Sequence, residues 1–370
     1  MKNTKISKGL RLIAFFLVAI ILVCAFGFSA DGWQIDKNDK TEPQSGGTSS
    51  PPEQNPDKEN EGDSSENNAP PITKRYYNRL TGEETTKELA YSEYISFVIN
   101  TSMPMYGLAY ADISIEFPIE TGGTRFLAFV NTAANIPKIG SLSETRRYIS
   151  NLSKAFDSRI LSNGNDDSVD YPFCHIDDTL TKPENISGNI YREFGKYTYT
   201  SGYLLRDVVS SYDETDENLE LEYAFKFTDA SQSLKSDSYF NKITIPYSDV
   251  SETTLIYSTD SSGYLLEKNG TLIKDMTNAE QAIYKNCFVL FADSAIYESQ
   301  SSTQLVLNTM GQGSGYYFTE GSAMQISWIL SEDGSFKLYD KDLNELTINR
   351  GKSFISFFKS SMIETIILSQ

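Results

Sequence analysis

Residues 111–129, which read ADISIEFPIETGGTRFLAF, limit the folds that this chain can adopt. Apolar and polar residues alternate from position 113 to 120. Such alternation places apolar side chains on one face of a strand and polar side chains on the other. The double glycine at 122–123 is typical of a turn, and TRFLAF indicates a second strand. The stretch therefore predicts a β-hairpin with one face in a core.

The turn also predicts which side chains face each other across the hairpin. If Gly122 and Gly123 form a two-residue loop, Glu120 lies opposite Arg125, and the two form a structural ion pair. An exposed pair of this kind contributes about 0.2–1 kcal/mol. Glu116 lies on the polar face of the same strand with no sequence-local partner. The hairpin is therefore either braced by ion pairs or, through Glu116, part of a binding site.

Two longer helices and one short helix are expected. Residues 141–157 carry an apolar stripe at helical spacing, and Ser141 with Glu144 fits a capping box. A second helix is expected at 201–211, and a short one near 278–285.

Beyond residue 225 the sequence changes to strand candidates separated by short turns, and Asn269–Gly270 is a strong hairpin signal. The whole pattern predicts an α+β fold. A mixed α/β domain over 72–225 is followed by a mostly β domain over 226–370.

The first part of the chain, residues 1–30, predicts a signal segment or membrane anchor. Four positive residues precede an unbroken apolar run from Leu12 to Phe28, a pattern that starts export. Cys24 lies in ILVC, which loosely resembles a bacterial lipidation box, although Val23 stands where a small residue is expected. An uncleaved anchor, a lipid anchor at Cys24 and cleaved release remain open. Each of them places the folded part on the extracytoplasmic side of the cell membrane.

Residues 31–71 predict a disordered acidic linker, because they are rich in Ser, Asn, Gln, Glu, Asp and Pro. Such a linker holds a folded body near the membrane without fixing its orientation. The formal net charge of the chain is −18. An acidic body repels phosphate backbones, so nucleic acid is not expected as a partner.

Few residues offer catalytic or metal-binding chemistry. His175 is the one histidine of the chain, so any Ser-His-Asp or Cys-His mechanism must use it. Its neighbour Cys174 points to the opposite face of an extended chain. Three cysteines and one histidine are too few for a disulfide framework or a multi-histidine metal site. No metal, cofactor or catalytic residue is therefore predicted.

Several motifs occur in order along the chain. They are NRLTG (78–82), GLAYADISIEFPIETGGTRFLAF (107–129), IGSLSETRRY (139–148), YREFGKYTYTS (191–201), GQGSGYYFTEGSAMQISW (311–328) and LYDKDLNELTINRGKSFI (338–355). In this order the chain resembles the YerB-like family of bacterial lipoproteins of unknown function. The resemblance implies a cell-envelope location and a two-domain body, α/β and then β. It implies no established activity.

The chain departs from the family at several polar positions. Ser143 and Leu266 stand where the resemblance implies arginine, and the histidines expected near Ser162, Lys196 and Ile273 are absent. Polar residues that match the family are Glu116, Glu120, Arg125, Arg146, Tyr191, Arg192, Tyr199 and Asp275. If the family's polar residues bind a shared ligand, this chain has lost or changed it.

Three of the retained residues define the predicted ligand site. We expect Glu116, Arg146 and Arg192 to line one pocket close to the N-terminus of the helix in 141–157. A helix N-terminus carries partial positive charge, which suits an anionic ligand. The alternative is that Arg146 pairs with Glu116 and closes the space.

Two classes of function remain open. The favoured one is a non-catalytic envelope module that binds a cell-wall component or an envelope protein through the cleft between its domains. The alternative is an extracytoplasmic hydrolase of a cell-wall component, with Glu116 and a second carboxylate such as Asp275. Glu120 cannot be that second carboxylate, since residues four apart on a strand are separated by about 13 Å and paired glycosidase carboxylates by about 5–9.5 Å.

Overall fold

A computed structural model describes most of the chain beyond residue 74. The described residues are 4–5, 75–87, 94–101, 104–163, 191–193, 197–210, 223–234, 238–298 and 303–370. The apolar run Leu12–Phe28 with Cys24, the predicted linker 31–71, and His175 lie outside them. Among the described residues, no helix has the length and apolar character that a membrane span requires.

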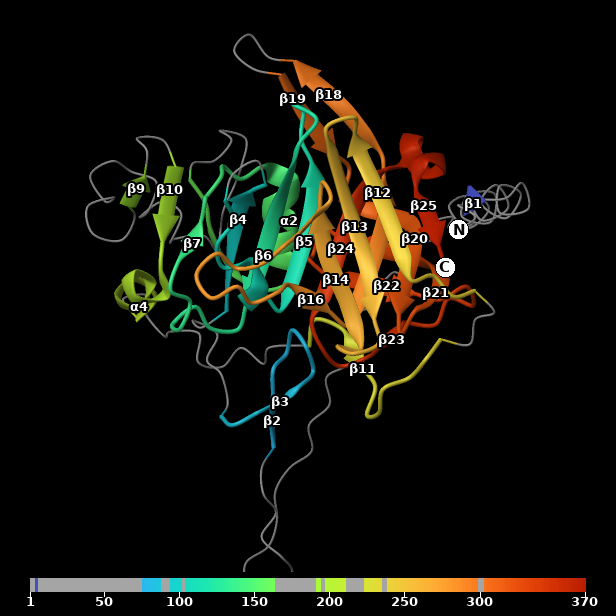
Figure 1. Ribbon diagram of the computed structural model, residues 1–370, viewed down its shortest axis with the longest axis horizontal. Coiled ribbons are helices and arrows are strands. Elements are labelled where there is room, and N and C mark those ends of the chain that lie inside the picture. Colours follow the sequence, from blue (N-terminus) through green and yellow to red (C-terminus); the bar gives the residue numbers. More distant parts are fainter. Residues whose placement is uncertain are drawn as a thin grey trace, which may run out of the picture. The chain divides into compact units, whose positions relative to one another are not determined.

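A nine-stranded mixed sheet forms the centre of a mostly β body (Figure 1). Its strand order is β22 (Phe336–Tyr339), β21 (Ser322–Leu330), β20 (Gly311–Thr319), β17 (Asn286–Ala292), β24 (Ser353–Lys359), β5 (Ile113–Pro118), β6 (Thr124–Val130), β4 (Ile95–Asn100) and β8 (Arg159–Leu161). β24 runs parallel to both β17 and β5. Strands from both predicted domains therefore build one continuous sheet, and residues 75–370 belong to one compact unit.

A second sheet of seven strands packs on one face of the first (Figure 1). It contains β1 (Thr4–Lys5), β25 (Ile367–Ser369), β12 (Lys242–Ser248), β13 (Ser251–Ser258), β14 (Gly263–Lys268), β15 (Thr271–Leu272) and β16 (Ile283–Tyr284). Apolar side chains of both sheets form a single buried cluster, which includes Ile243 and Leu255 from the second sheet and Phe126 and Phe354 from the first. The predicted turn at Asn269–Gly270 is confirmed, since it joins β14 to β15 with positive φ at both residues.

Helix α2 (Arg147–Ala155) packs on the opposite face of the nine-stranded sheet. Its Ile149 and Leu152 lie in a second buried cluster with Val98 and Phe129 of the sheet. The helix is shorter than the predicted segment 141–157, and the predicted capping box is wrong. Arg146 is the N-cap residue and makes no side-chain cap.

The second predicted helix is confirmed as α4 (Gly202–Ser210), whereas the short helix near 278–285 is wrong. In its place the chain makes a turn with positive φ at Ala279 and then enters β16, where Tyr284 pairs with Tyr264 of β14. As a strand, this segment forms backbone hydrogen bonds with the edge strand β14, which a short helix could not form.

Smaller elements lie around the two sheets (Figure 1). They are β2 (Tyr76–Tyr77) paired with β3 (Glu84–Thr85), β7 (Ile139–Gly140) with β10 (Tyr197–Thr200) and β9 (Tyr191–Glu193), β11 (Lys226–Phe227) with β23 (Thr347–Ile348), β18 (Ser294–Glu298) with β19 (Thr303–Leu307), and the 3-10 helices η2 (Leu108–Tyr110) and η4 (Ser360–Thr365).

The β5–β6 hairpin exists, but the predicted register is wrong. Pro118 pairs with Thr124 and Phe117 with Arg125, so the loop spans 119–123 rather than two glycines. Ile119 closes it with an N–H that donates to the Gly123 carbonyl at 3.0 Å. Proline has no amide hydrogen to donate, which is consistent with the ladder ending at Pro118. Glu120 consequently lies in the loop and not opposite Arg125.

Candidate ligand-binding site

Glu116 is fully buried between the two sheets and not in a pocket. Its carboxylate accepts hydrogen bonds from Lys268 Nζ at 2.6 Å and from Thr253 Oγ1 at 2.8 Å. Thr124 Oγ1 donates a further bond of 2.6 Å. These donors come from β14, β13 and β6, so Glu116 joins the nine-stranded sheet to the second sheet. Lys268 is 152 residues away in the sequence, which is why no local pattern indicated it.

Arg125 and Arg146 share the carboxylate of Glu144. Arg125 Nη2 lies 3.0 Å from Glu144 Oε1, and Arg146 Nη2 lies 2.7 Å from the same oxygen. Arg146 Nη2 also contacts Glu120 Oε1 at 3.1 Å. We call these four residues the arginine cluster. The predicted ion pair between Glu120 and Arg125 is wrong, because Arg125 binds Glu144 and Glu120 binds Arg146.

The structure does not bring Glu116 and Arg146 together. Glu116 is enclosed by its own donors, and Arg146 binds Glu120 and Glu144. Neither the shared pocket nor the direct pair between Glu116 and Arg146 is formed. Arg192 lies in β9, where its backbone pairs with Thr198, and its side chain lies outside the described part of the chain.

The two carboxylates of the hydrolase alternative are held separately. Asp275 is buried and accepts hydrogen bonds from the Gly107 N–H at 2.7 Å and the Thr277 N–H at 2.9 Å. Glu116 is bound by lysine and threonine side chains elsewhere. A catalytic carboxylate must reach its substrate, so these two buried groups give the hydrolase little support. Among the described residues, no three His, Cys, Asp or Glu side chains are grouped to hold a metal ion.

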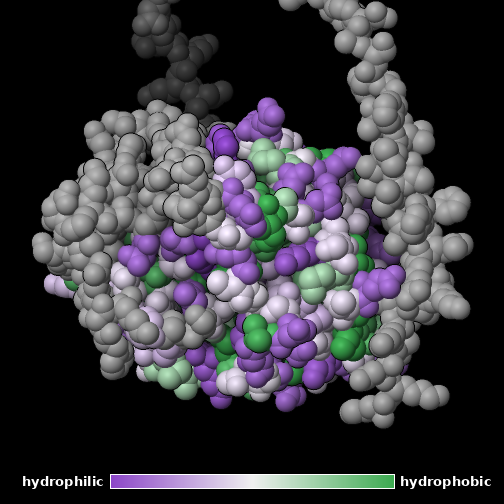
Figure 2. All heavy atoms as spheres, turned by 90° about the horizontal axis from the view of Figure 1, so that it is seen from above, coloured by the Kyte–Doolittle hydropathy of each residue, from purple (hydrophilic) through white to green (hydrophobic). Residues whose placement is uncertain are grey.

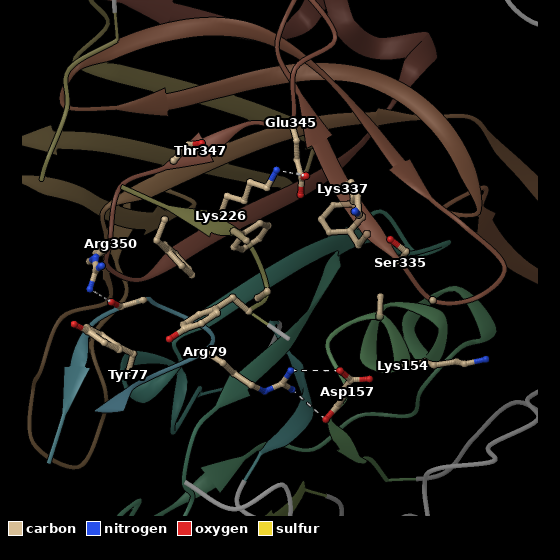
Figure 3. A pocket seen from close by; sticks show the side chains of 18 of the residues that line it. Tyr77, Arg79, Lys154, Asp157, Lys226, Ser335, Lys337, Glu345, Thr347 and Arg350 are labelled. Carbon is tan, nitrogen blue, oxygen red and sulfur yellow. Dashed lines mark hydrogen bonds and ion pairs between the residues drawn. The ribbon is translucent and has the colours of Figure 1, made fainter. Parts of the chain in front are cut away.

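A groove of about 1140 Å³ lies where the C-terminal end of α2 meets β11, β22 and β23 (Figure 3). We call it the aromatic groove. Its lining residues are Tyr77, Arg79, Gly82, Lys154, Ala155, Asp157, Tyr223, Ala224, Phe225, Lys226, Phe227, Asp229, Asp333, Gly334, Ser335, Phe336, Lys337, Glu345, Thr347 and Arg350. Volumes of 300–1,000 Å³ are typical of small-molecule sites, so the groove can take a ligand of substantial size.

The aromatic residues of the groove are held by the core behind them. Phe225 and Phe336 are each nearly buried and contact Phe156 of the core edge-on, at ring-centroid distances of 5.9 and 5.7 Å. Phe227 packs directly on Gly82, where a Cβ atom would lie 2.4 Å from the ring. Gly82 also has φ of +68°, a conformation that glycine adopts without a steric penalty. Phe225, Phe227 and Phe336 of the aromatic wall are therefore held by packing against Phe156 and Gly82.

Charged side chains surround the aromatic residues. Lys226 pairs with Glu345 at 2.6 Å and Arg350 with Asp229 at 3.2 Å (Figure 3 shows the first pair). The Lys226 side chain is 58% exposed and that of Asp229 is fully exposed, so both pairs are weak and can exchange partners with a ligand. Lys337 is exposed and, within the described part of the chain, makes no ion pair.

Sequence reasoning missed this groove because its residues come from four distant segments. One signal was available, since NRLTG (78–82) and the motif at 338–355 both contribute lining residues. The two motifs are in contact here. Arg350 Nη1 donates to the Gly82 carbonyl at 2.9 Å, and the Arg350 guanidinium lies 4.8 Å from the centre of the Tyr77 ring.

The described residues form a mostly β body in which an N-terminal and a C-terminal part share one sheet. Residues 80–217 match the family model "Protein of unknown function (DUF3048) N-terminal domain", and residues 243–355 match the corresponding C-terminal domain. The chain belongs to this YerB-like two-domain family, as the motifs predicted.

A solved structure has the same fold. The crystal structure of the YerB protein from Bacillus subtilis aligns with a TM-score of 0.62 and 20% sequence identity, over 80% of this chain and 99% of that one. At this identity the likeness concerns the fold alone. No curated protein matches the chain.

Proposed function

We propose that this protein is a membrane-tethered, extracytoplasmic binding module of the cell envelope, and that the aromatic groove binds a cell-wall component. The apolar run Leu12–Phe28 would tether it, through the membrane or through lipid on Cys24. The acidic linker 31–71 would then let the groove reach ligands near the membrane.

The groove is the observation that carries this proposal. Aromatic faces favour sugar rings or apolar side chains, and the surrounding lysines, arginines and carboxylates favour a ligand with charges of both signs. Peptide-bearing wall fragments have sugar rings, carboxylates and amines in one molecule. The weak pairs Lys226–Glu345 and Arg350–Asp229 can open to meet such groups.

A thermal-shift titration with soluble wall fragments tests the proposal on the full chain in detergent. A fragment at about 100 times its dissociation constant stabilises the protein by about 2.7 kcal/mol. Tyr223 is 52% exposed in the groove, and Tyr239 is 55% exposed outside its lining. Y223A should reduce the shift and Y239A should leave it unchanged. Absence of a shift with every fragment, or equal effects of the two variants, would contradict binding in the groove.

A further inference from the structure

The arginine cluster differs from the ion pair between Glu116 and Lys268 in one respect. In the pair between Glu116 and Lys268 both side chains are buried, with 0% and 7% exposure. In the arginine cluster both arginine side chains are only 8% exposed, whereas that of Glu144 is 45% exposed. The cations are thus enclosed by protein, and the shared carboxylate enters from the solvent side.

Other contacts hold the two arginines independently of the Glu144 carboxylate. Arg125 extends from the inner strand β6, and its Nη1 donates to the Glu144 main-chain carbonyl at 3.2 Å. Arg146 directly precedes α2, and its own carbonyl accepts the N–H groups of Ile149 and Ser150. Arg146 is also bound by Glu120, whose Oε2 accepts the Leu305 N–H of β19 at 3.4 Å. The cationic part of the cluster is therefore preformed.

Loss of the Glu144 carboxylate would leave this part of the cluster short of negative charge. Two arginines would face Glu120 alone, a formal balance of +1. Arg125 Nε is already buried without a hydrogen-bond acceptor. The N-terminal end of α2, which begins at Arg147, adds partial positive charge. Because enclosed, unpaired charge is costly, another carboxylate would be favoured in the same place.

We propose that Arg125 and Arg146 form a carboxylate-binding site that the chain's own Glu144 occupies, and that an external carboxylate competes with Glu144 for it. Glu144 is attached to the chain beside Arg146, so it competes at a high effective concentration and weakens binding of the external group. Leu305 of β19 places the cluster near the projecting β18–β19 pair. Figure 2 views that end of the molecule, where hydrophilic and hydrophobic side chains are mixed.

The site is distinct from the aromatic groove. Arg146 lies before the first residue of α2, and the groove is lined by Lys154 and Ala155 at the other end of the helix. An absence of ligand binding at one site would therefore not argue against binding at the other.

Acetate is the probe for a test on the full chain, with the melting temperature as the readout and sodium chloride at equal ionic strength as the blank. We expect E144A to melt below the wild type and to recover with saturable acetate binding, at least about tenfold tighter than that of the wild type. The matched control is E193A, which removes the glutamate of the ion pair with Lys138, outside both the arginine cluster and the aromatic groove. It should respond to acetate no more than to chloride.

A second variant separates a binding site from a simple brace. E144A/R125K keeps the positive charge but loses the guanidinium fork, one arm of which donates to the Glu144 main-chain carbonyl while the other is directed at the carboxylate position. Acetate binding should therefore weaken markedly. The proposal is overturned if E144A binds acetate no more tightly than the wild type, or if E144A/R125K binds acetate as tightly as E144A. Saturable binding of phosphate without acetate would overturn the assignment to carboxylates.

Discussion

Glu116 on β5 and Lys268 on β14 form an ion pair of 2.6 Å across the interface of the two sheets. Both side chains are almost completely enclosed, and Thr253 donates to the same carboxylate. The pair therefore connects the N-terminal and C-terminal parts of the chain inside the core, and either partner alone would be an uncompensated buried charge.

Replacement of Lys268 by methionine should lower the free energy of unfolding by about 3–5 kcal/mol, because the Glu116 carboxylate would stay buried without its cation. The double variant E116M/K268M should recover much of this loss, since apolar residues can replace a buried pair. Urea denaturation measures both. K226M, which breaks an exposed pair, is the control and should cost under about 1 kcal/mol. A K268M cost as small as that of the control would show that the pair does not fasten the sheets.

Asp112 at the start of β5 gives the folded state a pH dependence. Burial, the largest cause, raises the pKa of its carboxyl from 3.8 to about 6, although the Asn131 N–H donates to it at 2.9 Å. Between these two values the unfolded chain releases a proton that the folded chain keeps. This residue therefore contributes a loss of stability that grows as pH rises from about 4 to 6 and is constant above that.

The variant D112N should remove this contribution. Between pH 4 and pH 7 the stability of the wild type relative to D112N should fall by up to about 3 kcal/mol. Denaturant unfolding at the two pH values measures this, and the use of a difference cancels the other acids. A relative stability that is independent of pH would mean that Asp112 titrates at its ordinary pKa.

Alanine substitutions at Gly82 and Gly270 distinguish the stability cost of backbone strain from the cost of a steric clash. Both have positive φ, +68° and +76°, but a Cβ at Gly82 would lie 2.4 Å from the Phe227 ring, and one at Gly270 would contact nothing within 4 Å. G270A should cost about 1 kcal/mol from strain alone. G82A should cost about 1–3 kcal/mol more, because Phe227 must move. Equal losses in thermal unfolding would mean that the aromatic wall of the groove is loosely packed.

Local sequence patterns predicted the positions of strands and turns better than the contacts between them. Alternation located β5 and β6, and Asn269–Gly270 located a hairpin, because these signals reside in adjacent residues. The register of β5 and β6 was mispredicted by the assumption of a two-residue glycine loop. The helix after residue 141 begins late because Glu144, which was expected to cap it, binds Arg125 and Arg146.

The sites depend on contacts that no local pattern contains. Lys268 meets Glu116 from 152 residues away, and Arg350 meets Gly82 from 268 residues away. Glu116 was correctly predicted to lie on the polar face of a strand. The second sheet covers that face, so the Glu116 side chain is buried. The aromatic groove was missed for the same reason, since its members read in the sequence as separate strands and turns.

Photo-crosslinking in a wall-bearing bacterium that produces the full chain tests whether the aromatic groove binds a cell-wall component. A photoreactive residue replaces exposed Lys337 in the groove, or in a control Val250, which is 69% exposed and does not line it. We expect wall fragments to be recovered on the protein crosslinked at position 337 and not at position 250. Equal recovery at both positions, or no wall material at position 337, would contradict it.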